Sequence, residues 1–388
     1  MPLESIRQRF SSVLQSRKEQ SLYRSRPLIT TPQSAEMSIN GQAIINFSAN
    51  DYLGFANHSA LKQVAQQFEQ LSYGSGAAHL VTGHHAEHHL LEEEIADWLD
   101  CERALIFSTG YMANLAVLQS LMQKGDVILA DKLSHASLID GALSSNAELK
   151  RYPHLDMQAL EKRLQQAQQK QQQTLIVTDG VFSMDGDIAP LKQIQQLAKQ
   201  YQAWVYIDDA HGVGVLGENG KGVFEYFNQT IDENTILMGT LGKAFGCSGA
   251  FVAGSDTVIE SLIQFSRPYI YTTAMPAINA RVCRKALQLV KNASVEREKL
   301  HSNVQYFKQQ IKKLNLDLLP SETAIQAIIL KESEIAVNWS EQLKKQGFWV
   351  TAIRPPTVPK NTARLRITLS ASHTTKQIDK LLTAMSSL

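Results

Sequence analysis

Around Lys243 the chain reads Met238-Gly-Thr-Leu-Gly-Lys-Ala-Phe-Gly-Cys-Ser-Gly-Ala250, directly after the apolar run at 235–239. Small residues leave little side-chain bulk around this lysine, and no carboxylate lies near it in the sequence. Such an amine suits the formation of a Schiff base with a bound carbonyl compound. A solvated lysine in a glycine-rich turn explains the stretch equally well when it is considered alone.

Upstream of this lysine, short apolar runs alternate with helical patterns. A hairpin with Asn40-Gly41 at its turn precedes this series. Strands separated by helices predict a mostly parallel sheet that is covered on both faces, an α/β fold. The expected strands are 104–107, 127–130, 148–152, 174–178 and 204–208, and the expected helices are 59–71, 87–99, 111–123, 136–143, one from 156 and one from 190.

The order of elements changes after Met275-Pro276. Two long helical patterns run to about residue 313, and a strand (324–330), a helix (335–346), two strands (348–353 and 363–369) and a helix (374–385) follow. This order predicts a smaller C-terminal α+β domain that packs closely, since no linker rich in Pro, Gly or Ser precedes it. The expected divisions are an N-terminal helix and extended segment (1–58), a large domain (59–289) and a small domain (290–388).

Composition favours small-molecule partners. The 388 residues carry 38 Lys+Arg against 37 Asp+Glu, and no block of like charge points to nucleic acid or to an anionic membrane. Three widely spaced cysteines are typical of a reduced, cytoplasmic protein, and no apolar run is long enough to cross a bilayer. Residues 1–26 resemble a transit peptide in part, but we interpret them as an amphipathic helix that packs on the body or on a partner subunit.

Polar residues follow the predicted strands where each strand ends. Because ligands of open parallel sheets bind at the carboxyl ends of the strands, we expect these residues to gather at one edge. They are Ser108-Thr-Gly110-Tyr111 at a helix start, His135, Ser183, Asp208, His211, Thr240 and Lys243. This inventory suits pyridoxal phosphate, which needs a lysine for its aldehyde, a buried carboxylate for its ring nitrogen and a helix N-terminus for its phosphate.

Two other patterns invite different interpretations. Residues 212–217 match G-x-G-x-x-G after a strand, but Glu-Asn-Gly-Lys-Gly follows in place of a helix, which disfavours dinucleotide binding. His84, His85, His88 and His89 have helical spacing that could suit a metal ion, yet no acidic or cysteine ligand set accompanies them, and we expect no metal.

Longer motifs extend through nearly the whole chain. They are 46–54 (NFSANDYLG), 74–76 with 82–83 (GSG, TG), 134–137 (SHAS), 180–187 (GVFSMDGD), 208–212 (DDAHG) and 240–243 (TLGK). Together they resemble the α-oxoamine synthases, which are fold-type I pyridoxal-phosphate-dependent transferases. Members of that family condense an amino acid with an acyl thioester and release carbon dioxide.

The resemblance implies a role for each residue at the sheet edge. Lys243 would hold the cofactor and remove the Cα proton of the amino acid, and His135 would stack on the cofactor ring. Asp208 would pair with the pyridinium nitrogen. The phenolic oxygen would be bonded by His211 and Ser183, and the phosphate by the amides of Gly110 and Tyr111, by Thr240 and by Thr273 of the partner in a homodimer.

The resemblance also implies the substrates. The stretches AIRPPTVP (352–359) and TARLR (362–366) are similar to the branch that joins L-alanine to a pimeloyl thioester for biotin synthesis. Arg354 would bind the substrate carboxylate with Asn50 nearby, Thr357 would face the acyl substrate, and Arg24 would contact its chain. The acyl carrier could be coenzyme A or acyl carrier protein. A sibling that uses glycine and a short acyl thioester, an aminotransferase and a non-catalytic pyridoxal-phosphate-binding protein remain alternatives.

Overall fold

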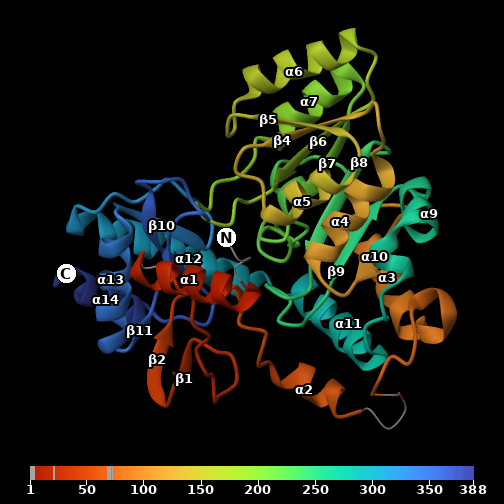
Figure 1. Ribbon diagram of the computed structural model, residues 1–388. Coiled ribbons are helices and arrows are strands. Elements are labelled where there is room, and N and C mark those ends of the chain that lie inside the picture. The colour runs from red at the N-terminus through yellow and green to blue at the C-terminus, as the bar shows by residue number, and fades with distance from the viewer. Residues whose placement is uncertain (1–4, 21, 68–70, 72) are drawn as a thin grey trace. The chain divides into compact units, whose positions relative to one another are not determined.

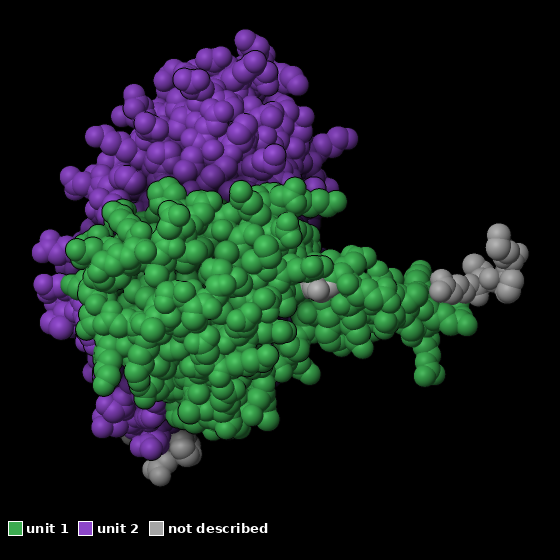
Figure 2. Space-filling view, turned by 90° about the vertical axis from the view of Figure 1, so that its left-hand side faces the viewer, with its two compact units in different colours: residues 1–49, 184–186, 300–388 green, residues 50–183, 187–299 purple. Residues whose placement is uncertain are grey.

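The computed structural model describes residues 5–20, 22–67, 71 and 73–388, which divide into two compact units (Figure 2). Unit 1 combines residues 1–49, 184–186 and 300–388, and unit 2 combines residues 50–183 and 187–299. The N-terminal segment thus joins the C-terminal segment in one unit. The predicted divisions after residues 58 and 289 stay predictions, and the limits of the two units fall elsewhere.

Unit 2 is built on a seven-stranded sheet in the order β3-β9-β8-β7-β6-β4-β5. All neighbouring pairs among β8, β7, β6, β4 and β5 are parallel, whereas β9 runs antiparallel to both of its neighbours. The mostly parallel sheet is therefore confirmed. The strands are β3 (Arg103–Phe107), β4 (Val127–Asp131), β5 (Glu148–Tyr152), β6 (Thr174–Asp179), β7 (Trp204–Asp208), β8 (Thr235–Thr240) and β9 (Ala250–Gly254).

Helices cover both faces of this sheet because all of its strands except the edge strand β5 are largely buried on both sides. One set of alternate strand residues, which includes Leu105, Ile128, Val177 and Met238, packs against α4 and α5, and the residues between them are equally buried. Figure 1 shows α6 and α7 side by side near β5. The helices of this unit are α2 (Ser59–Ala65), η2 (His79–Gly83), α3 (Ala86–Leu99), α4 (Gly110–Leu121), α5 (Ala136–Ser144), α6 (Met157–Gln169), α7 (Leu191–Tyr201), α8 (Val223–Tyr226), α9 (Asp256–Phe265), α10 (Arg267–Ile270) and α11 (Ala277–Lys291).

Several elements of unit 2 differ from the prediction, which did not include η2, α8, α9 or α10. The sequence did not reveal β9, and β9 follows β8 after only nine residues, 241–249, which is too short for the crossover that parallel strands need. Its antiparallel direction follows from that short connection. The first helix of the series ends at Ala65 rather than at Leu71; residues 68–70 and 72 lie outside the described part of the chain.

Unit 1 contains two three-stranded sheets. The order β1-β2-β11 includes the predicted hairpin, in which Asn40 and Gly41 both have positive φ, and the second sheet has the order β10-β13-β12. The elements are β1 (Glu36–Ile39), β2 (Gln42–Asn46), η3 (Lys312–Leu314), β10 (Ile325–Lys331), α13 (Ser333–Lys345), β11 (Phe348–Trp349), β12 (Thr351–Ile353), β13 (Ala363–Thr368) and α14 (Thr375–Ser386). The boundary between the units at residue 300 falls within α12 (Ser294–Ile311).

The prediction of a single strand over 348–353 is wrong. Residues 348–349 pair with β2 in one sheet, and residues 351–353 pair with β13 in the other. The apolar run is continuous in sequence, so only its two different partners reveal the change of sheet at Val350.

The first helix, α1 (Ile6–Glu19), forms where the N-terminal amphipathic pattern predicted it. Ser5 and Gln8 make a capping box, and none of its residues is buried. In Figure 2 the helix projects from the rest of unit 1. Within the described ranges, no helix has the length and apolar character that crossing a membrane requires.

Candidate active site

The carboxyl ends of β4, β6, β7 and β8 carry six of the residues that the sequence predicted, namely His135, Ser183, Asp208, His211, Thr240 and Lys243. Asp179 at the end of β6 pairs in register with Asp208 at the end of β7, which in turn pairs with Met238 of β8. His135 follows β4, and Lys243 follows β8 in the loop at 241–249. Parallel register therefore brings these side chains to one edge of the sheet.

Asp208 is held in one orientation by two donors. Its side chain is 5% exposed, Nδ2 of Asn114 donates to its Oδ2 at 2.7 Å, and the N–H of Ala210 donates to its Oδ1 at 3.1 Å. The hydroxyl of Tyr206 donates to Oδ1 of Asn114 at 2.5 Å, which fixes the amide in turn. Sequence reasoning missed Asn114, although a lone polar residue in the apolar run of α4 was a signal.

Charges of both signs meet beside Asp208. Burial raises the pKa of Asp179 well above its usual value, the nearby Asp208 raises it further, and Lys243 lowers it. The pKa of Asp209 is also raised, first by burial and then by Asp208, while Lys243 again lowers it. Lys243, which is half-buried, is therefore close enough to act on Asp179, the register partner of Asp208, and on Asp209, its neighbour in sequence.

His135 is the N-cap of α5. Its Nδ1 accepts a bond from the N–H of Ser137 at 3.3 Å and lies 2.7 Å from the Ser137 hydroxyl, and its own N–H donates to Asp179 at 2.9 Å. The backbone and one ring nitrogen are thus fixed, while the residue remains exposed. This leaves its imidazole accessible to a flat ligand.

A second histidine, His211, follows β7. The hydroxyl of Tyr52 lies 2.5 Å from its Nδ1, and the two rings are 6.0 Å apart. Tyr52 belongs to the NFSANDYLG motif, so this contact links that motif to the edge of the sheet. Ser183 lies in the loop that follows β6, and Asn50 begins unit 2.

The start of α4 offers backbone donors. Thr109 caps the helix by accepting from the N–H of Met112, so Gly110 and Tyr111 are the first two helical residues. Thr240 accepts from the N–H of Gly242 and donates to the carbonyl of Gly249. Thr273 forms a bridge with Ala78 and lines a small pocket that Ser108 also lines.

The glycines of the G-x-G-x-x-G pattern serve close packing inside the protein. A Cβ on Gly212 would lie 2.1 Å from a carboxylate oxygen of Asp209, one on Gly214 would lie 2.6 Å from Ala244, and one on Gly217 would lie 2.2 Å from Glu225. Turns continue beyond this stretch, and α8 starts only at Val223. The structure therefore explains these glycines without a dinucleotide.

The histidine cluster includes a member that the pattern did not contain, His79. Ring nitrogens of His79 and His84 lie 3.1 Å apart, and burial is the main reason why the pKa of His79 falls to about 3. Both nitrogens of His88 bond the backbone, with the Met275 carbonyl at 2.8 Å and the His85 N–H at 2.9 Å. His88 therefore has no lone pair left for a metal ion, although it lies within ligand distance of the other two.

Sequence reasoning also missed His154. Its Nδ1 lies 2.9 Å from Asp131 and its Nε2 lies 2.6 Å from Asp187, and the ring packs edge-on against Phe182 at 4.4 Å. The two carboxylates outweigh burial and raise the pKa of His154 to about 9. No motif marked this histidine, because its two partners come from distant parts of the sequence.

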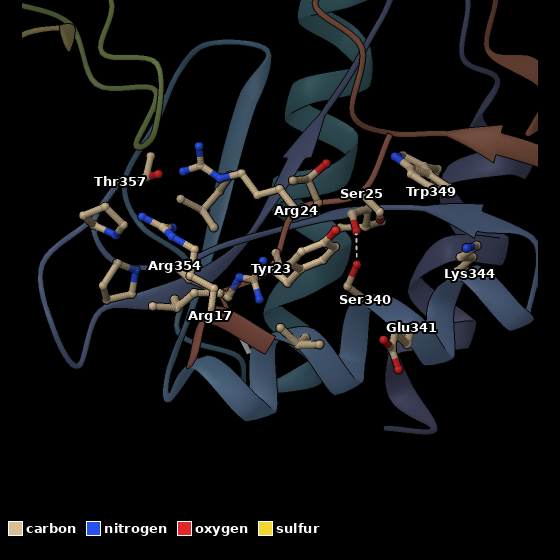
Figure 3. Close-up of a pocket in the computed structure, with 18 residues that line it drawn as sticks. Arg17, Tyr23, Arg24, Ser25, Ser340, Glu341, Lys344, Trp349, Arg354 and Thr357 are labelled. Atoms are coloured by element: carbon tan, nitrogen blue, oxygen red, sulfur yellow. Dashed lines mark hydrogen bonds between the residues drawn. The ribbon is translucent and has the colours of Figure 1, made fainter. Parts of the chain in front are cut away.

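The remaining predicted residues, Arg24, Arg354 and Thr357, line a pocket of about 530 Å³ within unit 1 (Figure 3). Burial lowers the pKa of Arg354, and the nearby Arg24 guanidinium lowers it further. The structure thus brings the early arginine and the AIRPPTVP motif to the same pocket.

Comparisons with known proteins agree with this geometry. The model of the family described as aminotransferase class I and II matches residues 42–385. The chain belongs to that family. Within it, the 8-amino-7-oxononanoate synthase of Hydrogenovibrio crunogenus is 69% identical to this chain, over 99% of this chain and 97% of that protein. The enzyme of the same name from Saccharophagus degradans is 48% identical, over 98% and 96%.

Solved structures of the class I and II aminotransferase type share the fold. A serine palmitoyltransferase from S. paucimobilis, with a bound PLP-myriocin aldimine, superposes with a TM-score of 0.93 at 30% identity and covers 99% of this chain and 98% of that one. The 8-amino-7-oxononanoate synthase of Francisella tularensis gives 0.76 at 33% identity, over 89% and 97%. The predicted fold-type I class and the resemblance to α-oxoamine synthases are therefore confirmed.

Proposed function

We propose that the chain is a pyridoxal-phosphate-dependent acyltransferase that condenses L-alanine with a pimeloyl thioester to give 8-amino-7-oxononanoate, in biotin synthesis. A carbon–carbon bond forms between the alanine Cα and the thioester carbonyl carbon, the carbon–sulfur bond breaks, and the alanine carboxylate leaves as carbon dioxide. The observation that carries the proposal is the oriented, buried Asp208, whose register partner Asp179 has its pKa lowered by Lys243. The names of the relatives at 69% and 48% identity support the choice of reaction.

The residues at the sheet edge fit pyridoxal phosphate. Bound there, the cofactor supplies a pyridinium ring that accepts the electron pair left when the amino acid loses its Cα proton. Asp208 holds the proton on the ring nitrogen, since Asn114 and Ala210 keep its carboxylate aimed in one direction. Lys243 would hold the cofactor through its aldehyde and would carry the Cα proton of the amino acid.

The other roles follow the same geometry. His135 lies against the ring, and His211 and Ser183 bond the phenolic oxygen. The N–H groups of the first two residues of α4 bond the phosphate, where the helix dipole favours an anion. Further phosphate contacts come from Thr240 and, in a homodimer, from Thr273 of the other copy.

Arginine is the side chain best suited to the substrate carboxylates. Arg354 binds the amino-acid carboxylate with a planar pair of donors, assisted by Asn50. Arg24 and Thr357 contact the acyl substrate, and both line the pocket of unit 1 with Arg354. The acyl carrier is coenzyme A or acyl carrier protein, and we expect the protein to act in the cytoplasm.

One observation favours a second candidate of the same reaction type. The fold superposes better on serine palmitoyltransferase than on the 8-amino-7-oxononanoate synthase of F. tularensis, with TM-scores of 0.93 and 0.76. Condensation of another amino acid with another acyl group is therefore the alternative. The chain is 30% identical to that transferase but 69% identical to an 8-amino-7-oxononanoate synthase, which favours L-alanine and the pimeloyl group as substrates.

Release of free thiol tests the two candidates directly. The purified protein with pyridoxal phosphate is supplied with L-alanine, glycine or L-serine, each combined with pimeloyl-, acetyl-, succinyl- or palmitoyl-CoA. We expect rapid release with L-alanine and pimeloyl-CoA alone. Rapid release with glycine and a short acyl group, or with L-serine and palmitoyl-CoA, would replace the proposed substrates.

A further inference from the structure

The pocket of unit 1 is lined by two segments that are far apart in sequence. One is the end of α1 with the chain after it, at residues 17 and 22–25, and the other runs from α13 to the AIRPPTVP motif. Figure 3 shows Arg17, Arg24 and Arg354 on one side of this view with Tyr23 beside them, and Lys344 and Glu341 on the other. Three guanidinium groups therefore border one cavity of about 530 Å³.

The lining has an excess of positive charge. Arg17, Arg24, Arg354 and Lys344 face a single acidic residue, Glu341. Across residues 5–20, 22–67, 71 and 73–388, no ion pair joins Arg17 or Arg24 to a carboxylate. Like charges around one cavity repel one another, as the effect of Arg24 on the pKa of Arg354 indicates, so an anion in the cavity would stabilise the arrangement.

Local structure explains why Arg17 reaches the cavity. It lies in the last turn of α1, and the N–H of Leu22 bonds its carbonyl at 2.8 Å, which turns the chain back after the helix. The ammonium of Lys18 lies 5.2 Å from the Tyr23 ring and supports the same turn. Arg17 and Arg24 therefore border one cavity, although seven positions separate them.

We propose that Arg17 determines specificity by binding, together with Arg24, the distal carboxylate of a dicarboxylic acyl chain. The inference rests on the proposed function, which already uses Arg354 for the amino-acid carboxylate. A pimeloyl thioester brings a second carboxylate, at the end of its chain away from the thioester. A fatty acyl chain has a methyl group there and gains nothing from two guanidinium groups.

Lys344 is less suited to this role. Its ammonium lies 5.2 Å from the Trp349 ring, and an ammonium cannot make the paired, planar bonds that a carboxylate accepts from arginine. Arg17 is exposed and makes no ion pair with any of the described residues, so its side chain is available to a ligand.

The test compares two substrates that differ only at the end of the chain. Thiol release with L-alanine is measured for pimeloyl-CoA and heptanoyl-CoA, with the wild type and with Arg17→Gln. Loss of a bond to a charged group predicts a roughly 10- to 100-fold lower kcat/KM for pimeloyl-CoA. The value for heptanoyl-CoA should stay within about twofold, because no carboxylate is lost from its site.

Arg7→Gln is the matched control. Arg7 lies on the same helix and is exposed, and it does not line the cavity. We expect it to leave both substrates unchanged. Arg17→Lys should restore part of the preference, since it keeps the charge and loses the paired geometry.

Binding without turnover separates this inference from the proposed function. Calorimetry in the absence of amino acid compares pimeloyl-CoA with heptanoyl-CoA on the wild type and on Arg17→Gln. A preference for pimeloyl-CoA that disappears in Arg17→Gln supports the inference even if L-alanine releases no thiol, in which case only the proposed function fails. An unchanged preference in Arg17→Gln, or an equal loss for both thioesters, overturns the inference while wild-type condensation stands.

Discussion

Asn114 shows how one residue outside every motif can set the chemistry of a buried carboxylate. Its amide donates to Asp208 at 2.7 Å and to the Ser137 hydroxyl at 2.7 Å, and its carbonyl accepts from Tyr206. This network orients Asp208 and also fixes Ser137, which bonds the ring of His135. Asn114 therefore helps to orient both the Asp208 carboxylate and, through Ser137, the His135 ring.

Replacing Asn114 should slow the reaction without abolishing it. Asn114→Ala leaves Asp208 with the Ala210 donor alone, and loss of a bond to a buried charge predicts a roughly 10- to 100-fold lower kcat/KM. Gln119→Ala is the control, because Gln119 lies on the same helix and bonds the Ser144 hydroxyl rather than Asp208. Steady-state kinetics with both variants checks the prediction, and equal effects from the two would count against it.

Lys243 allows a stricter test at the residue scale. Lys243→Ala removes the amine that bonds the cofactor aldehyde, so we expect no activity and no visible absorbance from covalently held pyridoxal phosphate. Asp208→Asn should retain the coloured complex and lose roughly 100- to 1,000-fold in kcat, as for a lost electrostatic group in a buried site. Absorbance spectra and thiol release measured together check both, and normal turnover by Lys243→Ala would refute the site.

At the scale of elements, His154 joins the end of β4 to the loop after β6. Asp131 also accepts from the N–H groups of Leu133 and Leu155, and Phe182 donates its N–H to the Asp187 carbonyl. The same imidazole thereby holds the segment that leads to His135 and the segment that carries Ser183. We infer that its ion pairs keep these two connections in place.

The raised pKa of His154 predicts a pH dependence of stability. The folded value of about 9 lies above the ordinary value of 6.5, so the stabilisation is complete below about 6.5 and is lost as the pH rises through about 9. The shift corresponds to a contribution of His154 to the free energy of unfolding on the order of 3 kcal/mol. Urea unfolding across this pH range should show a decline in the wild type that is absent in His154→Gln, and parallel declines would contradict the assignment.

The elements show what a sequence pattern can and cannot predict. Helices such as α3 and strands such as β7 were predicted to within a residue, because a buried sheet and an amphipathic face leave regular apolar spacing. The antiparallel β9 and the division of 348–353 between two sheets were missed, since both depend on partners that are distant in sequence. For the same reason motifs indicated His135 and Lys243 but not Asn114 or His154.

At the scale of the whole molecule, the proposed homodimer shares its sites between two copies. Thr273 is expected to bond the phosphate held by the other copy. Within its own chain it lines a small pocket with Ser108, which directly precedes the Thr109 cap of α4. Experiment can decide which copy's phosphate it serves.

Mixed dimers can distinguish whether Thr273 bonds the phosphate of its own chain or that of the other copy. Lys243→Ala and Thr273→Glu chains, each inactive as a homodimer, are co-expressed with different tags and the heterodimer is purified through both. If Thr273 serves the other copy, one site keeps both residues and the heterodimer recovers about half of the wild-type activity per dimer. If Thr273 serves its own chain, both sites are damaged and no activity returns.

The most direct measurement follows the carboxyl carbon of L-alanine. L-Alanine labelled with carbon-13 at the carboxyl group is incubated with the holoenzyme and pimeloyl-CoA, and the gas phase and products are examined by mass spectrometry. Decarboxylative condensation predicts labelled carbon dioxide, one for each thiol released, and unlabelled 8-amino-7-oxononanoate. Labelled pyruvate without thiol release would show amino-group transfer and contradict the proposed reaction.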